Sequence, residues 1–272
     1  MRKNQLINVM LMNVMLMNKI LCIIMYSNSI IHNNSIIHNN SIIHNNSIIH
    51  NNSIIHNSVK KHKYTFIMLH PMFSDSTYFN DYIEYLKNNS IIANNIKFIL
   101  PESPLMDIDY PNNKQYNVKS WYNYYTCYNN LSKLDKINSD DYNLQTQKIV
   151  SIINNEASVL KSYKNIFILG VSQGGTLLFN ILKFLPEALG GLFCIKSLYM
   201  YKYINLKTNN ATPMFFFSGN KDDVYNLTFQ IKCSKLLERN YNISWTIIEG
   251  LDHYEKREEE YTFVLKYFLL NI

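Results

Sequence analysis

Cysteine is scarce in this sequence, and its spacing excludes the usual cysteine-based sites. The chain of 272 residues holds four cysteines: Cys22, Cys127, Cys194 and Cys233. None forms a C-x-x-C pair and no histidine stands at ligand spacing, so we expect no zinc or other metal site. Cys194 and Cys233 stand in apolar stretches, which predicts buried thiols rather than a disulfide. Free thiols favour a reducing compartment, and we expect a cytoplasmic protein.

A strong basic stripe and long apolar runs are also lacking. The net charge is +6, but the basic residues are scattered and do not alternate with aromatic residues, so we expect no nucleic-acid partner. Arg2 and Lys3 precede a Met-, Leu- and Ile-rich stretch that ends near Tyr26. Its longest uninterrupted apolar run, Ile20–Met25, is too short to span a membrane. A signal, an anchor or a helix on the membrane surface stays open for residues 1–26, and with it membrane association or secretion.

The first 58 residues differ from the rest by internal repetition. The tetrapeptide SIIH recurs with a period of six. Its copies start at Ser29, Ser35, Ser41, Ser47 and Ser53. Three interpretations compete: low-complexity sequence without a fold, a histidine tract that binds metal, and a β-solenoid with every histidine on one strand face. Five copies would make fewer than two solenoid coils. We therefore expect a low-complexity segment at residues 1–58 and a folded domain at residues 59–272.

From residue 63 onwards, short apolar runs alternate with helical patterns. The runs with the length of buried strands are 64–69, 96–100, 166–169, 192–200, 213–217 and 243–248. The helical patterns lie near 78–87, 144–160, 176–185, 227–237 and 258–270. Buried strands that alternate with helices predict an α/β fold, with a mostly parallel sheet and helices on both faces. The long polar stretch Pro101–Tyr142 interrupts the alternation and is typical of a binding loop or lid.

A cluster of glycines marks the candidate nucleophile. The chain holds only seven glycines, and three of them lie in the six residues Gly170–Gly175, which read GVSQGG. This segment contains G-x-S-x-G, with the apolar run IFIL before it and a helical pattern after it. A serine at such a strand–turn–helix junction is typical of a hydrolase nucleophile, and the alternative is an ordinary Gly-rich turn. A phosphate-binding P-loop is excluded because no Lys-Ser or Lys-Thr pair follows. Ser172 is therefore the predicted nucleophile.

The partners of a serine nucleophile should follow it in chain order. Outside the repeats there are three histidines, and only His253 follows Ser172. His253 stands just after the last predicted strand, and we predict that it is the base. The strand between them ends near Asp222 and Asp223. We favour Asp222 as the acid that orients the imidazole, with Asp223 as a solvated or helix-capping neighbour.

An oxyanion hole needs backbone N–H groups that face the reacting carbonyl. Gln173, directly after the nucleophile, should supply one of them. The loop after the first strand should supply the other, and since Pro71 has no N–H, Met72 is the candidate. His70 belongs to the same loop and is expected to be structural.

These residues together resemble the acyl-protein thioesterase family, also called the phospholipase/carboxylesterase family of small α/β-hydrolases. The resemblance covers about residues 64–270. It is carried by LH at 69–70, P-x-x-P at 101–104, SW at 120–121, G-x-S-Q-G-G at 170–175, the acid loop at 219–222 and E-G-x-x-H at 249–253. It implies the α/β-hydrolase fold, the triad Ser172, Asp222 and His253, the oxyanion donors Met72 and Gln173, and a place for Trp121 near the acyl pocket.

The sequence departs from the family at four positions. The family usually has glycine where this chain has Pro71 and Phe73, aspartate at Ser74, and proline at Asp223. These changes motivate one rival, an inactive hydrolase-fold protein that serves as a binding module. The intact triad favours a cofactor-free serine esterase or thioesterase. The resemblance implies that it removes fatty acyl groups from a protein or lipid, with peripheral membrane contact as a further expectation. A lysophospholipase or small-ester carboxylesterase is the alternative with the same chemistry.

Overall fold

The computed structural model describes most of the chain from residue 62 onwards. Described in full are residues 62–110, 113–126, 133–204, 211–238 and 241–272. Among the repeats, the backbone is described at 37–38, 41–44, 47–50 and 53–56. The candidate signal or anchor at residues 1–26 lies outside the described residues. Within the described part of the chain, no helix is both long enough and apolar enough to cross a membrane.

Six parallel strands form the centre of the sheet, one at each of the six apolar runs of the sequence, although the strand in the run 192–200 already ends at Ile195. In spatial order they are β6 (Ile96–Pro101), β5 (Tyr64–Leu69), β9 (Ile166–Val171), β10 (Gly191–Ile195), β11 (Met214–Gly219) and β12 (Ile243–Ile248). The strands β9, β10 and β11 are buried along their whole length. Burial on both faces explains why their sequences are continuous apolar runs.

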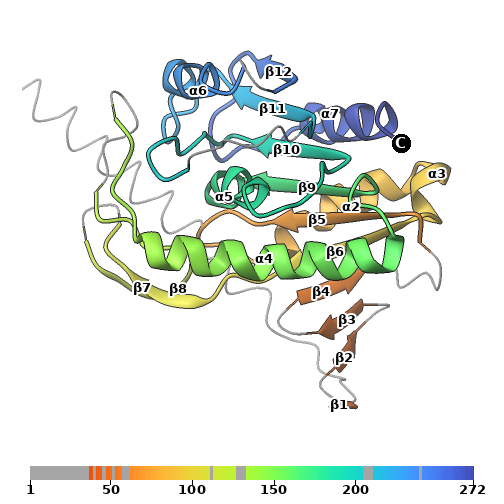
Figure 1. Ribbon diagram of the computed structural model, residues 1–272. Coiled ribbons are helices and arrows are strands. Elements are labelled where there is room, and N and C mark those ends of the chain that lie inside the picture. Colours follow the sequence, from red (N-terminus) through yellow and green to blue (C-terminus); the bar gives the residue numbers. More distant parts are fainter. Residues whose placement is uncertain are drawn as a thin grey trace, which may run out of the picture. The chain divides into compact units, whose positions relative to one another are not determined.

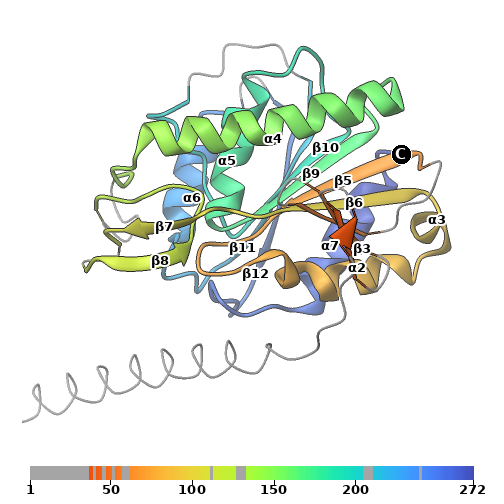
Figure 2. The ribbon, with the colours of Figure 1, turned by 90° about the horizontal axis from the view of Figure 1, so that it is seen from below.

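Helices cover both faces of this sheet (Figures 1 and 2), as the sequence predicts. One core lies under α4 (Ser139–Leu160), α5 (Gln173–Leu182) and α6 (Leu227–Ser234). The opposite core lies under η1 (Ser76–Phe79), α2 (Asn80–Lys87), α3 (Ser90–Ala93) and α7 (Glu258–Leu269). Alternate strand residues feed the two cores: Ile67 packs into the first and Phe66 into the second. The predicted α/β fold is therefore confirmed.

The insert Pro101–Tyr142 contains regular structure that the sequence did not predict. An antiparallel hairpin is formed by β7 (Leu105–Ile108) and β8 (Gln115–Lys119). Its residues are mostly exposed or half-buried, so they lack the apolar pattern of the central strands. The insert ends where α4 begins at Ser139 rather than at Leu144. The side chain of Asn138 caps this helix by accepting hydrogen bonds from the N–H groups of Asp140 and Asp141.

Four copies of the repeat have strand backbone. These strands are β1 (Ile37–His38), β2 (Ser41–His44), β3 (Ser47–His50) and β4 (Ser53–His56). β2, β3 and β4 pair antiparallel with serine opposite histidine, and β4 pairs antiparallel with β6. An antiparallel arrangement differs from the coils of a solenoid. The low-complexity interpretation and the boundary at residues 58 and 59 stay predictions, because much of the segment lies outside the described residues.

Both cysteines in the described part of the chain follow the sequence-based expectation. Cys194 in β10 and Cys233 in α6 are buried and free. Burial raises the pKa of each thiol, so both stay protonated at neutral pH. The prediction of buried thiols is confirmed.

Candidate active site

A strained turn between β9 and α5 presents Ser172. Its backbone has φ 52° and ψ −119°, in the half of conformational space that glycine favours. The flanking glycines make this turn sterically feasible. A Cβ at Gly170 would lie 2.5 Å from the carbonyl oxygen of Gly174, and a Cβ at Gly174 would lie 2.3 Å from that of Leu69. Both distances are too short for any side chain. This is the geometry of a nucleophile elbow, with strain stored where a reactive side chain is displayed.

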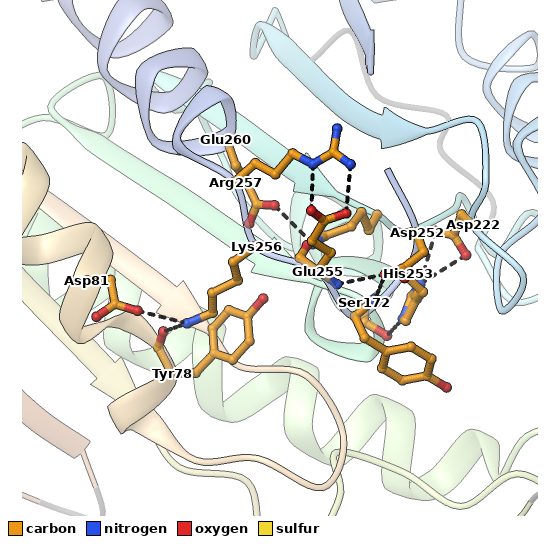
Figure 3. Close-up of polar contacts among 12 residues, drawn as sticks. Tyr78, Asp81, Ser172, Asp222, Asp252, His253, Glu255, Lys256, Arg257 and Glu260 are labelled. Carbon is orange, nitrogen blue, oxygen red and sulfur yellow. Dashed lines mark hydrogen bonds and ion pairs between the residues drawn. The ribbon is translucent and has the colours of Figure 1, made fainter. Parts of the chain in front are cut away.

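His253 and Asp222 lie beside Ser172 (Figure 3), and each of the three comes from the end of a different strand. The imidazole Nε2 of His253 is 2.8 Å from the hydroxyl oxygen of Ser172. Its Nδ1 is 3.0 Å and 2.9 Å from the two carboxylate oxygens of Asp222. All three side chains are buried or nearly so. The structure thus brings together the three residues that the sequence singled out.

The carboxylate of Asp222 is held by several donors at once. Its Oδ1 accepts hydrogen bonds from the backbone N–H groups of Val224 at 3.0 Å and Tyr225 at 2.6 Å. Its Oδ2 accepts a longer one, at 3.4 Å, from the side-chain amide of Gln230. Hydrogen bonds from N–H donors stabilise the charged form of a carboxylate and fix its orientation. The neighbouring Asp223 is exposed, so the structure brings Asp222, and not Asp223, to His253.

The loop after β5 is ordered by His70, which is completely buried. The Nε2 of His70 accepts a hydrogen bond from the backbone N–H of Ser103 at 3.1 Å. The neutral ring therefore carries its proton on Nδ1, and burial lowers its pKa, which favours this neutral form. Nδ1 donates to the carbonyl oxygen of Pro71 at 2.8 Å. In a trans peptide the carbonyl and the next N–H point in opposite directions, so this bond also fixes the N–H of Met72.

The N–H groups of both proposed oxyanion donors make no hydrogen bond among the residues that the structure describes. The backbone N–H groups of Met72 and Gln173 donate to no group within that part of the chain. Next to Met72, Phe73 has φ 63°, the left-handed region that suits glycine. Its N–H donates to the carbonyl of Lys119 at 2.8 Å, at the end of β8. Phe73 therefore adopts a backbone conformation that suits glycine. Its hydrogen bond to the hairpin stabilises that conformation.

The side chain of Gln173 ties the insert to the elbow, a role that the sequence did not reveal. Its Oε1 accepts a hydrogen bond from the backbone N–H of Trp121 at 2.9 Å. Its Nε2 donates to the carbonyl of Tyr122 at 2.8 Å and to the hydroxyl of Ser120 at 3.0 Å. The insert is thus fixed to the residue that follows the nucleophile.

Trp121 is only 1% exposed and lies against the loop after β5. Its indole N–H donates to the carbonyl of His70 at 2.8 Å, and the centroids of the two rings are 5.0 Å apart. These contacts with His70 stabilise the loop after β5. A contact between Trp121 and the acyl chain stays a prediction.

A chain of buried hydroxyl groups links the elbow to the acid loop, and sequence reasoning missed it. Thr176 contacts Tyr122 at 2.6 Å, Tyr122 contacts Tyr124 at 2.9 Å, and Tyr124 contacts Tyr225 at 2.8 Å. Tyr225 is also a backbone donor to Asp222. Burial raises the pKa of all three tyrosines, which keeps them neutral. The only signal in the sequence is the tyrosine-rich composition of the insert.

The family model for phospholipase/carboxylesterase matches residues 50–269. This chain belongs to the phospholipase/carboxylesterase family. Acyl-protein thioesterase 1 of Kluyveromyces lactis is 26% identical over 184 residues, which cover 65% of this chain and 78% of that protein. Acyl-protein thioesterase 1 of Eremothecium gossypii is 22% identical over 170 residues, or 60% of this chain and 68% of that protein.

Solved structures share the fold of this chain. SOBER1 of Arabidopsis thaliana has a TM-score of 0.64 at 18% identity, and the match covers 76% of this chain and 98% of that chain. Acyl-protein thioesterase 2 of Zea mays has a TM-score of 0.64 at 16% identity, with 80% and 98% covered. The comparisons confirm the predicted family, the α/β-hydrolase fold and the hydrolase class.

Proposed function

We propose that this family member is a serine hydrolase that removes fatty acyl groups from thioesters or oxygen esters, with Ser172 as nucleophile, His253 as base and Asp222 as acid. The observation that carries the proposal is the position of His253, whose two ring nitrogens lie within hydrogen-bond distance of Ser172 and Asp222. Nucleophilic catalysis by serine requires a base that is hydrogen-bonded to the nucleophile and a third group that orients the base.

Acylation begins when the hydroxyl oxygen of Ser172 attacks the carbonyl carbon of the substrate. Its proton passes to Nε2 of His253, and the negative charge collects on the carbonyl oxygen. The N–H groups of Met72 and Gln173 stabilise that oxyanion. The bond to the leaving sulfur or oxygen then breaks, and the leaving group takes the proton from Nε2. Asp222 keeps the Nδ1 proton of His253 in place throughout.

Deacylation runs through the same groups in reverse. A water molecule gives a proton to Nε2 of His253 and attacks the acyl carbon. The bond to Ser172 breaks, its oxygen recovers the proton, and the free fatty acid leaves. Every atom and proton is accounted for by the chain, the substrate and water.

The acyl donor is proposed from the relatives. Both curated relatives are named acyl-protein thioesterases, which supports a fatty acyl thioester on a protein, with a lipid ester as the related substrate. The two buried free thiols, Cys194 and Cys233, support a reducing compartment such as the cytoplasm.

The decisive experiment is labelling of the purified full chain with a fluorophosphonate probe, followed by hydrolysis assays. We expect labelling of wild type and none of Ser172→Ala, whereas Ser158→Ala, at an exposed serine of α4, should still be labelled. A palmitoyl thioester, a lysophospholipid and an acetyl ester then separate the candidate substrates. A folded wild type that neither labels nor hydrolyses any of the three would refute the hydrolase and favour the inactive binding module instead.

A further inference from the structure

Two charged residues beneath the candidate active site are completely buried. Lys196 directly follows β10, and Glu260 lies in the first turn of α7. Both side chains are 0% exposed, and the ammonium nitrogen of Lys196 is 3.0 Å from Oε2 of Glu260. Charged residues are almost never fully buried unless they are paired, because their desolvation is costly. No step of the triad chemistry uses this pair.

Lys196 makes a hydrogen bond to the loop that carries His253. Its Nζ donates a hydrogen bond to the backbone carbonyl of Glu255 at 2.6 Å, two residues after His253. The contact with Glu260 is different. Neither carboxylate oxygen of Glu260 has a hydrogen-bond partner in the described part of the chain, although the ion-pair distance is short. Lys196 therefore makes its hydrogen bond to the loop, and Glu260 lies at ion-pair distance from it. Burial lowers the pKa of Lys196 to about 8 and raises that of Glu260, so desolvation opposes the charge on both groups.

The backbone of Lys196 is held in a strained conformation. Its φ is 45°, in the left-handed region where a residue other than glycine is uncommon. Its N–H donates to the carbonyl of Phe217 in β11 at 2.7 Å. The residue before it, Ile195, accepts a hydrogen bond from the N–H of Ser172 at 3.0 Å. Lys196 is thus fixed to the frame that also holds the nucleophile, and backbone strain of this kind is concentrated at functional sites.

Other anchors hold the same loop at its outer side. The ammonium of Lys256 donates to the carbonyl of Tyr78 at 2.6 Å and lies 3.8 Å from the centroid of the Tyr78 ring. Arg257 donates to the carbonyl of Glu249 at 3.2 Å. Figure 3 shows Glu255 between Glu260 and the pair His253 and Ser172, with Lys256 reaching toward Tyr78. These outer contacts are partly exposed, whereas the bond from Lys196 is made inside the protein.

We propose that Lys196 is a positioning residue for His253: it fixes the loop after β12 to the end of β10, so that Nε2 stays at bonding distance from Ser172. The inference rests on the proposed function, since it presupposes that His253 is the base. Catalysis is sensitive to such positioning because a displacement of about 1 Å can lower a rate by about 10²-fold.

The test compares three variants of the full chain: Lys196→Met, Glu260→Met and the double variant. Lys196→Met leaves the Glu260 carboxylate buried without its partner, so its melting temperature should fall. The double variant removes both charges, and replacing a buried ion pair by apolar side chains is often neutral or stabilising. Its melting temperature should therefore return toward wild type. Its kcat, per site titrated with a fluorophosphonate, should stay at least about tenfold lower with KM unchanged, since the bond to Glu255 is still missing.

Glu259→Gln, an exposed position beside Glu260 on the same helix, is the matched control and should behave as wild type. If the double variant recovers both melting temperature and kcat, Lys196 has only a structural role and the proposal is overturned. If the double variant does not fold, Lys196→Leu, which has no donor for the Glu255 carbonyl, is measured in the same way, and an unchanged kcat per titrated site overturns the proposal equally. A wild type that does not label at Ser172 would instead refute the proposed function.

Discussion

Asp222→Asn tests the proposed triad most sharply, because the surroundings of Asp222 dictate how an amide must sit. Two backbone N–H groups, from Val224 and Tyr225, donate to Oδ1. In the variant the amide oxygen must take this position, since an NH₂ group there would face two donors. The NH₂ group is then forced to the position of Oδ2, which lies 2.9 Å from Nδ1 of His253.

The consequence is a change of tautomer in His253. A protonated Nδ1 would face this NH₂ group at 2.9 Å, donor against donor, although it also lies 3.0 Å from the position of the amide oxygen. The tautomer with Nδ1 as acceptor and the proton on Nε2 is therefore favoured. A protonated Nε2 cannot take the proton of Ser172. In a Ser-His-Asp triad such a change lowers kcat about 10⁴-fold. At about 1.36 kcal/mol per factor of ten, this corresponds to about 5.4 kcal/mol of transition-state stabilisation. The fold should tolerate the change, because the two side chains have nearly the same shape.

The assay is thioester hydrolysis under saturating substrate, with circular dichroism and thermal melting as checks of folding. Asp223→Asn is the matched control: it makes the same chemical change at an exposed neighbour, and its kcat should stay within about tenfold of wild type. If Asp223→Asn were the more damaging change in folded protein, the acid would be misassigned by one residue. If Asp222→Asn retained more than about a tenth of the wild-type kcat, the tautomer argument would be refuted.

Three further predictions concern other parts of the chain. A chain that starts at Ser58 should keep its kcat within tenfold, because the proposed triad follows β9, β11 and β12, but it should aggregate more readily because the β6 edge loses its partner β4. Trp121→Phe should lower kcat/KM for palmitoyl and acetyl substrates, since the lost indole N–H supports His70, and the loss should be larger for palmitoyl because of the predicted contact with the acyl chain; equal losses would contradict that contact. Although desolvation opposes it, hydrogen bonds from His62, Lys97 and Thr65 lower the pKa of Glu156 to about 2. Wild type should therefore lose stability between about pH 4.5 and 2, and the melting temperature of Glu156→Gln should change less over that range.

The sequence was sufficient where a single local pattern determines the structure. Strands buried on both faces, such as β9 and β11, read as apolar runs because every side chain faces a core. The elbow was visible because the close approach of backbones around Ser172 admits only glycine at 170 and 174. His253 followed by elimination, since it is the only histidine after Ser172.

Contacts between distant segments could not be predicted in the same way. The side chain of Gln173 bonds to residues about fifty positions earlier, and no pattern in either segment announces the pairing. Lys196 lies inside the apolar run 192–200, and nothing in that run indicates its ion pair, because its partner Glu260 is supplied by a helix 64 residues later. The hairpin β7–β8 was missed because exposed strands carry no apolar signal.

The departures from the family pattern in the loop after β5 are resolved by such distant contacts. The family usually has glycine at position 73, and glycine tolerates a positive φ. Phe73 nevertheless adopts φ 63°. Three contacts hold the loop in this shape: His70 bonds to the Pro71 carbonyl, Trp121 to the His70 carbonyl, and Phe73 to the Lys119 carbonyl. Two of these partners, Trp121 and Lys119, belong to the insert. A conformation that glycine would adopt at little cost is here imposed by surrounding hydrogen bonds, so the insert supports the loop that carries the proposed oxyanion donor.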